Sequence, residues 1–315
     1  MKKKVLIAIA AVVLLASVML IPLGGTTIKE DIKNTKVETI NMNAYSSQNP
    51  STPLRLLFIH HSCGGQLMAD AGKESGDHCI YQSHENGGGL RSKLEQSSYE
   101  VHEASYESDI GDKTDIFDWP PKFKSKMEKI LTCDNQDTFY KDGRKNQIVA
   151  FKSCFPNNNF AAEGVSPGNS AGPELTVWNA KAAYMTLLDE FKKHPEVLFV
   201  AVTAPPVANY IEPEPLWKSL ARKVLGKEIV PSGPLARTFN NWLKDKNGWL
   251  KDYAEKNVVV FDYYDILTKN GKSDYSAYPT GDGTDSHASK EGNTAAADAF
   301  VPFLNRAVRR AGLSE

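Results

Sequence analysis

Five short apolar runs, separated by helix-like stretches, constrain the fold of this chain more than any other feature. They cover residues 54–61, 99–106, 146–154, 196–206 and 257–264. Continuous runs rich in β-branched and aromatic residues are typical of strands buried on both faces. Residues 173–194 have the spacing of an amphipathic helix, and residues 289–312 predict a final helix. This alternation predicts an α/β fold with a parallel sheet covered on both faces.

The first 53 residues differ in character from the rest of the chain. Three lysines precede an apolar run over residues 5–23, a pattern typical of an export signal. Residues 1–25 are therefore interpreted as a signal peptide or an N-terminal membrane anchor, which predicts an extracytoplasmic protein, secreted or anchored by this segment. Residues 26–53 are polar and aperiodic, so we expect a linker there. Residues 54–315 contain no internal repeat and predict one domain.

Charge and cysteine content limit the classes of partner. The formal net charge is −1, so nothing predicts a nucleic-acid partner. An even number of cysteines in a chain bound for an oxidising compartment predicts two disulfides, with four reduced thiols as the alternative. These cysteines are Cys63, Cys79, Cys133 and Cys154. They form no CxxC pair, so no zinc site or other metal site is predicted, and no cofactor is expected.

The stretch "LLFIHHSCGG" places Ser62 just past the carboxyl end of the first predicted strand. Ligands of parallel α/β sheets bind beyond these strand ends. A serine hydroxyl there is a weak nucleophile unless an imidazole takes its proton. His287, in "GDGTDSHAS" after the fifth predicted strand, returns to the same edge of the sheet and is the candidate base. Asp285 is the candidate acid that orients the ring, with Asp282 as a second candidate.

In order and spacing, residues 54–312 resemble the SGNH (GDSL-like) hydrolases, a superfamily of esterases and deacetylases. "FIHHSCGG" stands where the family has its first block, with Ser62 as nucleophile, and "GDGTDSHAS" resembles the final block, which supplies His287. The resemblance implies a flavodoxin-like, three-layer α/β/α fold with about five strands in the order 2-1-3-4-5. The chain departs from the family at Thr284, where an aspartate usually stands three residues before the histidine.

The resemblance also implies an oxyanion hole and a disulfide pairing. The family's glycine block corresponds to "YESDIGDKTD", which offers the Gly111 N–H, and its asparagine block corresponds to "AFKSCFPNNNF". The second block offers a side-chain amide from Asn157, Asn158 or Asn159. In the implied strand order the first and third strands are neighbours, within disulfide reach. We therefore expect a Cys63–Cys154 disulfide, which leaves Cys79 to pair with Cys133.

The leading hypothesis is an exported serine esterase that uses Ser62, His287 and Asp285 and needs no cofactor. Its expected substrate is an ester, with O-acetyl groups on carbohydrate first, as the family and the expected location imply. One alternative is a decayed SGNH-like protein that binds carbohydrate or acts as a scaffold. Another is a metal-dependent hydrolase with His60 and His61 as ligands, which is disfavoured because adjacent residues of a strand point to opposite faces. Membrane contact is expected only through the N-terminal segment.

Overall fold

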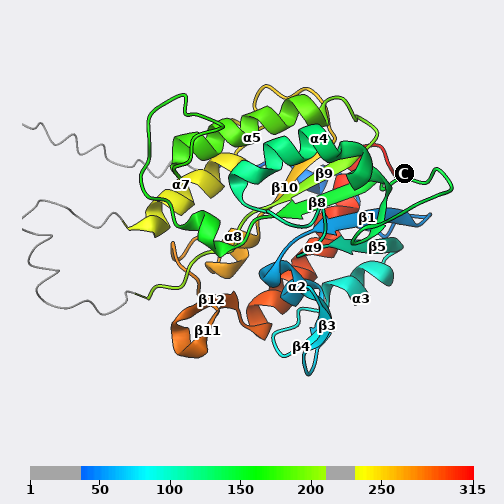
Figure 1. Ribbon diagram of the computed structural model, residues 1–315, viewed down its shortest axis with the longest axis horizontal. Helices are drawn as coiled ribbons and strands as arrows, with labels where there is room; N and C mark the ends of the chain where they lie inside the picture. The colour runs from blue at the N-terminus through cyan, green and yellow to red at the C-terminus, as the bar shows by residue number, and fades with distance from the viewer. Residues whose placement is uncertain (1–36, 211–230) are drawn as a thin grey trace, which may run out of the picture. The chain divides into compact units, whose positions relative to one another are not determined.

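The computed structural model describes residues 37–210 and 231–315, and residues 37–315 form one compact unit. Its centre is a five-stranded sheet in which every neighbouring pair of strands is parallel (Figure 1). The strands are β1 (Leu54–Ile59), β5 (Tyr99–Ala104), β8 (Ile148–Lys152), β9 (Leu198–Val202) and β10 (Val258–Phe261). They are arranged β5-β1-β8-β9-β10, which is the order 2-1-3-4-5. The predicted α/β fold and strand order are confirmed.

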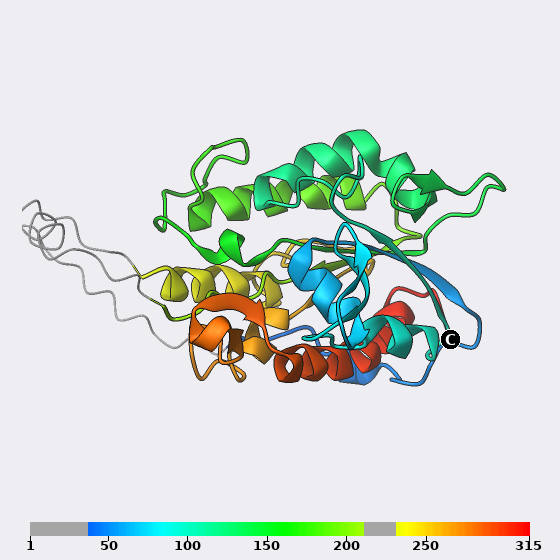
Figure 2. The same cartoon turned by 60° about the horizontal axis from the view of Figure 1, so that its bottom comes forward.

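Alternate residues of a strand point to opposite sides of the sheet, so each face presents apolar side chains. Helices cover both faces. Leu57 and Ile59 of β1 belong to one apolar core, and Leu56 and Phe58 belong to the other. Figure 2 shows α4 and α5 (green) on one side of the sheet and α9 (red) on the other. The first layer comprises α4 (Trp119–Thr132), α5 (Val177–Phe191) and α7 (Ser232–Lys244). The second comprises α2 (Ser62–Met68), α3 (Leu90–Glu95), α8 (Tyr263–Leu267) and α9 (Lys290–Arg310).

The two predicted helices form, with one shifted boundary. Helix α5 begins at Val177 rather than near residue 173, because the Thr176 side chain accepts a hydrogen bond from the Asn179 N–H and caps the helix there. The remaining elements are short. They are η2 (Met42–Ala44), β2 (Asp70–Ala71), β3 (Ser75–Asp77), β4 (Ile80–His84), η3 (Ile116–Asp118), β6 (Cys133–Asn135), β7 (Thr138–Phe139), η4 (Phe155–Asn158), β11 (Pro279–Thr280), η5 (Gly281–Gly283) and β12 (Asp285–Ala288).

Residues 37–53, the described part of the predicted linker, lie against the domain. The buried side chain of Asn305, on α9, donates to the Ser47 carbonyl at 2.8 Å and to Asn49 Oδ1 at 3.1 Å. The compact unit therefore begins before the predicted boundary at residue 54. The predicted export signal, residues 1–25, lies outside the described residues. Within the two described ranges, no helix is both long enough and apolar enough to cross a membrane.

Candidate active site

Ser62 is the first residue of α2, directly after the turn that follows β1. The two glycines behind it are there because α2 packs tightly against its surroundings. A Cβ atom on Gly64 would lie 2.3 Å from the Cβ of His60, and one on Gly65 would lie 2.0 Å from the Cys79 carbonyl oxygen. The helix can therefore begin at Ser62 only if these two positions lack side chains.

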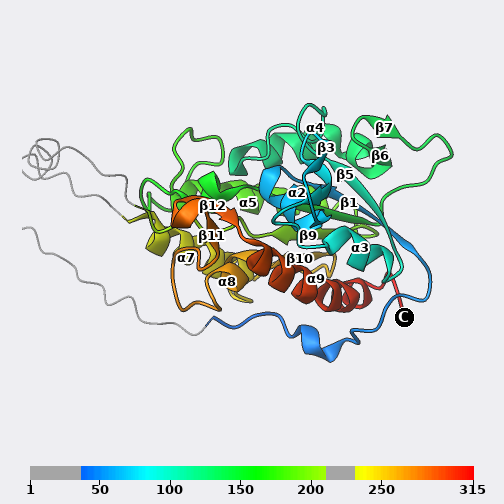
Figure 3. The same cartoon turned by 90° about the horizontal axis from the view of Figure 1, so that it is seen from below.

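His287 and Asp285 lie on β12, which runs beside the start of α2 (Figure 3). The His287 Nε2 is 3.0 Å from Ser62 Oγ, and the His287 Nδ1 is 2.8 Å from Asp285 Oδ1. Since a carboxylate accepts, the Nδ1–H donates to Asp285, which leaves Nε2 to accept from the Ser62 hydroxyl. Strand residues two apart face the same side. The shorter Asp–His spacing of this chain therefore suits an extended segment.

Asp285 is the residue that the structure brings to the His287 ring. Its Oδ1 also accepts the His287 backbone N–H at 3.0 Å. Partial burial raises the pKa of Asp285, but these hydrogen bonds from His287 outweigh it and hold the pKa below its usual value. Asp282 is exposed in η5, and the Thr284 hydroxyl donates to the Gly281 carbonyl at 2.7 Å.

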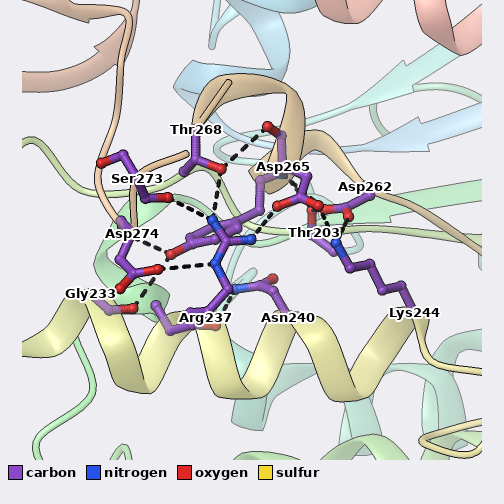
Figure 4. A network of polar contacts seen from close by, with 12 residues as sticks. Thr203, Gly233, Arg237, Asn240, Lys244, Asp262, Asp265, Thr268, Ser273 and Asp274 are labelled. Carbon is purple, nitrogen blue, oxygen red and sulfur yellow. Dashed lines mark hydrogen bonds and ion pairs between the residues drawn. The ribbon is translucent and has the colours of Figure 1, made fainter. Parts of the chain in front are cut away.

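A network of charged residues fixes the chain that leads into the β11–β12 hairpin (Figure 4). Arg237, on α7, donates to Asp265, to Asp274 at 3.1 Å and to the Ser273 carbonyl at 2.7 Å. Lys244, two turns further along α7, binds Asp265 and is 2.6 Å from Asp262. These contacts hold the segment from the end of β10 to residue 274. The segment is thereby anchored to α7 before it continues to His287.

His60, two residues before Ser62, is buried and has a protein partner at each ring nitrogen. Its Nδ1 is 3.0 Å from the His61 carbonyl and its Nε2 is 2.8 Å from Glu103 Oε2. Glu103 is also 2.6 Å from the Arg91 guanidinium. Burial raises the pKa of Glu103, but His60 and Arg91 outweigh it and hold the pKa below its usual value. Both ring nitrogens of His60 therefore have protein partners, the His61 carbonyl and the Glu103 carboxylate, and the ring is buried beside Glu103.

His61 faces the other way and is also fully engaged. Its Nε2 donates to the Gly111 carbonyl at 3.0 Å, and its Nδ1 accepts from the Thr114 hydroxyl at 3.1 Å. Burial lowers the pKa of His61, consistent with a neutral ring. Among the described residues, no group of three or more His, Cys, Asp or Glu side chains is placed to bind a metal. The ring nitrogens of both histidines have protein partners, so this pair does not fit the metal-dependent alternative.

The predicted oxyanion donors are engaged elsewhere. The Gly111 N–H donates to Ser108 Oγ at 3.2 Å. The Asn157 amide donates to Asp115 Oδ1 at 2.7 Å, and the Asn158 amide donates to the Ala204 carbonyl at 2.7 Å. Asn157 and Asn158 are buried and bind segments distant in sequence, whereas Asn159 is exposed. In this structure none of the first three groups is a free donor facing Ser62.

Tyr106 is the residue near Ser62 that the sequence did not reveal. It follows β5 by two residues. Its ring stacks on His61 with the centroids 3.7 Å apart and the planes at 23°. The available signal was its place just past the carboxyl end of a strand that neighbours β1.

The predicted disulfides are wrong, since all four cysteines are free thiols. Adjacency of β1 and β8 does bring Cys63 and Cys154 near each other, and their interaction lowers the pKa of Cys63 to about 7 and raises the pKa of Cys154. Cys79 and Cys133 have separate local partners. The Cys79 Sγ is 3.1 Å from the Tyr81 hydroxyl, and the Cys133 Sγ is 3.2 Å from the Gln136 carbonyl.

Comparison with known proteins gives one distant structural match. No family model matches the chain, and no curated protein sequence matches it. The fold is similar to that in the crystal structure of a catalytic mutant of Axe2, an acetylxylan esterase from Geobacillus stearothermophilus. The two chains are 12% identical, the match covers 84% of this chain and 96% of that chain, and the TM-score is 0.37.

Proposed function

We propose that this protein is a serine esterase with Ser62 as nucleophile, His287 as general base and Asp285 as the orienting acid. The observation that carries the proposal is the continuous chain from Ser62 Oγ to His287 Nε2 at 3.0 Å and from His287 Nδ1 to Asp285 Oδ1 at 2.8 Å. Nucleophile, base and acid are linked in this way in serine hydrolases of unrelated folds. The position of Ser62 past the end of β1 also agrees with the resemblance to SGNH hydrolases.

In the first half-reaction Ser62 Oγ attacks the carbonyl carbon of the ester. Its proton passes to His287 Nε2, and the electron pair of the carbonyl π bond moves onto the carbonyl oxygen. When that oxyanion collapses, the carbon–alkoxy bond breaks and His287 gives its proton to the leaving alcohol. Asp285, ionised because its pKa lies below the usual value, stabilises the intervening imidazolium.

In the second half-reaction a water molecule takes the place of the alcohol. His287 removes a proton from this water while the water oxygen attacks the acyl carbon. When the resulting oxyanion collapses, the bond between the acyl carbon and Ser62 Oγ breaks, His287 returns the proton to Ser62 Oγ, and the carboxylic acid leaves. The site is open enough for both steps, because the His287 side chain is 24% exposed and Ser62 is half-buried.

For the substrate, we propose a short acyl ester, with an acetyl group on a carbohydrate hydroxyl tested first. This choice rests on the family resemblance and on the predicted export. The export itself remains a prediction from residues 1–25.

Active-site labelling tests the proposal. The purified full-length protein is treated with a fluorophosphonate, and the modified peptide is located by mass spectrometry. We expect one adduct, on Ser62, together with release of acetate from acetylated sugars. Ser62→Ala and His287→Ala should each abolish both. Ser125→Ala, which removes an exposed hydroxyl bonded to its own helix, should change neither.

Each other outcome contradicts the proposal in a distinct way. Acetate release that survives Ser62→Ala would place the chemistry on another residue. A cooperatively folded wild-type protein that takes no label but binds sugar would favour the decayed carbohydrate-binding alternative.

A further inference from the structure

Acyl transfer at Ser62 creates two charges, and the residues described so far balance one of them. His287 becomes an imidazolium when it takes the Ser62 proton, and the Asp285 carboxylate, 2.8 Å from the ring Nδ1, balances that charge. The second charge is the oxyanion on the substrate. The backbone N–H and the asparagine amides that the sequence suggested for it bind protein acceptors instead. A further source of positive potential near Ser62 would stabilise this oxyanion.

Lys152, the last residue of β8, carries a buried positive charge. Its exposed fraction is 0%. Its ammonium donates to the Ser153 carbonyl at 3.1 Å and to Cys154 Sγ at 3.5 Å. In the part of the chain that the structure describes, these are its hydrogen-bond partners, and no carboxylate pairs with it. The positive charge of Lys152 is therefore not balanced by an ion pair.

Packing does not explain this charge. Buried lysines are usually paired with an acid, because an ammonium taken out of water is unfavourable without one. All five residues of β8 are buried, and the four before Lys152 are apolar. A methionine would fill a similar volume at this position and leave no charge to compensate. The presence of lysine instead points to a use for its charge.

The strand order places the Lys152 ammonium close to the nucleophile. Strand β8 lies beside β1 with Phe151 opposite Ile59, so Lys152 ends its strand level with the turn that leads to Ser62. Cys154 Sγ is 3.5 Å from Lys152 Nζ and 3.9 Å from Ser62 Oγ. A single sulfur atom therefore separates the ammonium from the attacking oxygen.

A charge in this position acts on the reaction through space. The interaction between two charges is strong where the surroundings are poorly polarisable, and a buried ammonium is little screened by salt. The ester is neutral when it binds, and its negative charge appears only in the transition state. A nearby positive charge therefore stabilises the transition state more than the bound ester, which raises kcat.

We infer that the Lys152 ammonium stabilises the oxyanion formed at Ser62 electrostatically, without touching the substrate. This inference rests on the proposed esterase function. It also gives Cys154 a role as a spacer between the ammonium and Ser62 Oγ. A direct hydrogen bond from the ammonium would occupy a lone pair of the oxygen that has to attack the ester.

The test removes the charge and keeps the volume. In Lys152→Met we expect kcat for an acetyl ester to fall about 30-fold with KM nearly unchanged. Lys152→Gln, which keeps a donor for the Ser153 carbonyl, should show the same fall. Lys181→Met is the matched control, because the Lys181 ammonium lies over the rings of Trp178 and Trp242. This control should keep wild-type kcat.

The variants are compared with the wild type under conditions in which the neighbouring thiols are neutral. The pKa of Cys63 is lowered to about 7, whereas interaction with Cys63 and burial raise the pKa of Cys154. At about pH 6 both thiols are therefore mostly protonated, and neither offsets the charge of Lys152.

Methylboronic acid separates an electrostatic role from a structural one. When Ser62 Oγ bonds to boron and its proton passes to His287, the neutral trigonal boron becomes a tetrahedral anion. The affinity for this inhibitor should fall in Lys152→Met by about the same factor as kcat. The affinity for the acetamide analogue of the ester, which stays neutral, should not change. Equal losses for both inhibitors would indicate a distorted site and contradict the inference.

The failure of this inference is distinguishable from that of the proposed function. If acetate release requires Ser62 but Lys152→Met keeps kcat within about twofold, the esterase stands and the charge of Lys152 does not serve the reaction. If the wild type releases no acetate and takes no label at Ser62, the function itself is wrong.

Discussion

At the scale of single residues, the spacing of Asp285 and His287 has a structural explanation. The two residues lie on the extended strand β12, where side chains two positions apart share a face. Asp285 can therefore accept both the ring N–H and the backbone N–H of His287. The carboxylate fixes the tautomer that leaves Nε2 free to accept from Ser62.

Asp285→Asn should preserve the fold and damage catalysis. The amide favours the wrong tautomer of His287, so we expect kcat to fall by up to about 10,000-fold with little change in KM. Because the pKa of Asp285 is lowered, the carboxylate is ionised at neutral pH, where kcat of wild type and variant should be compared. Asp282→Asn, at an exposed neighbour, is the control and should keep wild-type kcat.

The buried pair of Glu103 and His60 makes a prediction about pH and stability. Glu103→Gln leaves His60 and Arg91 without a carboxylate, and we expect a loss of about 3–5 kcal/mol in the free energy of unfolding at neutral pH. Since the folded-state pKa of Glu103 is lowered, its contribution is present above about pH 4.3 and is lost as pH falls through the folded value.

Urea denaturation of wild type and Glu103→Gln at a series of pH values measures this difference. The two stabilities should differ most at neutral pH and converge in acid. A difference that grew toward acid pH would contradict the pairing.

The structure brings together Ser62, His287 and Asp285, as the sequence predicted, whereas the Gly111 N–H and the Asn157 and Asn158 amides bind other partners. The positions of Ser62 and His287 could be predicted because both residues follow apolar strands. Their placement at one edge of the sheet depends only on topology. The role of Asn157 could not be predicted from the sequence, because it depends on the fold placing Asp115 Oδ1 2.7 Å from the Asn157 side-chain amide. The same holds for Cys63 and Cys154, whose adjacency follows from strand order, whereas their bonding state does not.

At the scale of elements, α2 shows how one helix start shapes the site. Glycine in a helix interior is less favourable than alanine by about 1 kcal/mol, so its presence at two consecutive positions needs a reason. The reason is contact: His60 lies under Gly64 and the Cys79 carbonyl lies against Gly65.

Gly65→Ala should therefore destabilise the protein despite improving helix propensity. Its Cβ would lie 2.0 Å from a backbone oxygen that no rotamer change can move. We expect a loss of about 1–3 kcal/mol, seen as a lower midpoint of thermal unfolding. Ser125→Ala on the exposed side of α4 serves as control and should stay within about 0.5 kcal/mol of wild type. A stabilised Gly65→Ala protein would contradict the close contact.

At the scale of the whole molecule, Asn305 links parts of the chain that are far apart in sequence. Its amide donates to residues 47 and 49, and its carbonyl oxygen accepts the Tyr99 hydroxyl at 2.7 Å. The segment before β1, the edge strand β5 and the last helix α9 thus meet at the buried side chain of Asn305. No periodicity in the sequence reports such a meeting, which is why residues 26–53 were predicted as a linker.

Asn305→Ala should loosen this junction. We expect a loss of about 2–4 kcal/mol in stability, since several buried polar groups lose their partners. Limited proteolysis should then cut within residues 37–53 faster than in the wild type. Asn43→Ala, at an exposed asparagine of the same segment, is the control and should be cut at the wild-type rate. Unchanged cleavage in Asn305→Ala would show that other contacts hold the segment.

The distance along the chain between Ser62 and His287, 225 residues, has a consequence for biosynthesis. Ser62 leaves the ribosome early, with the first strand, whereas His287 emerges only just before the final helix α9. A nascent or truncated chain carries the proposed nucleophile without its base. Under the proposed mechanism such a chain is inert toward esters, and hydrolytic activity begins only when His287 has emerged and β12 has docked beside the start of α2.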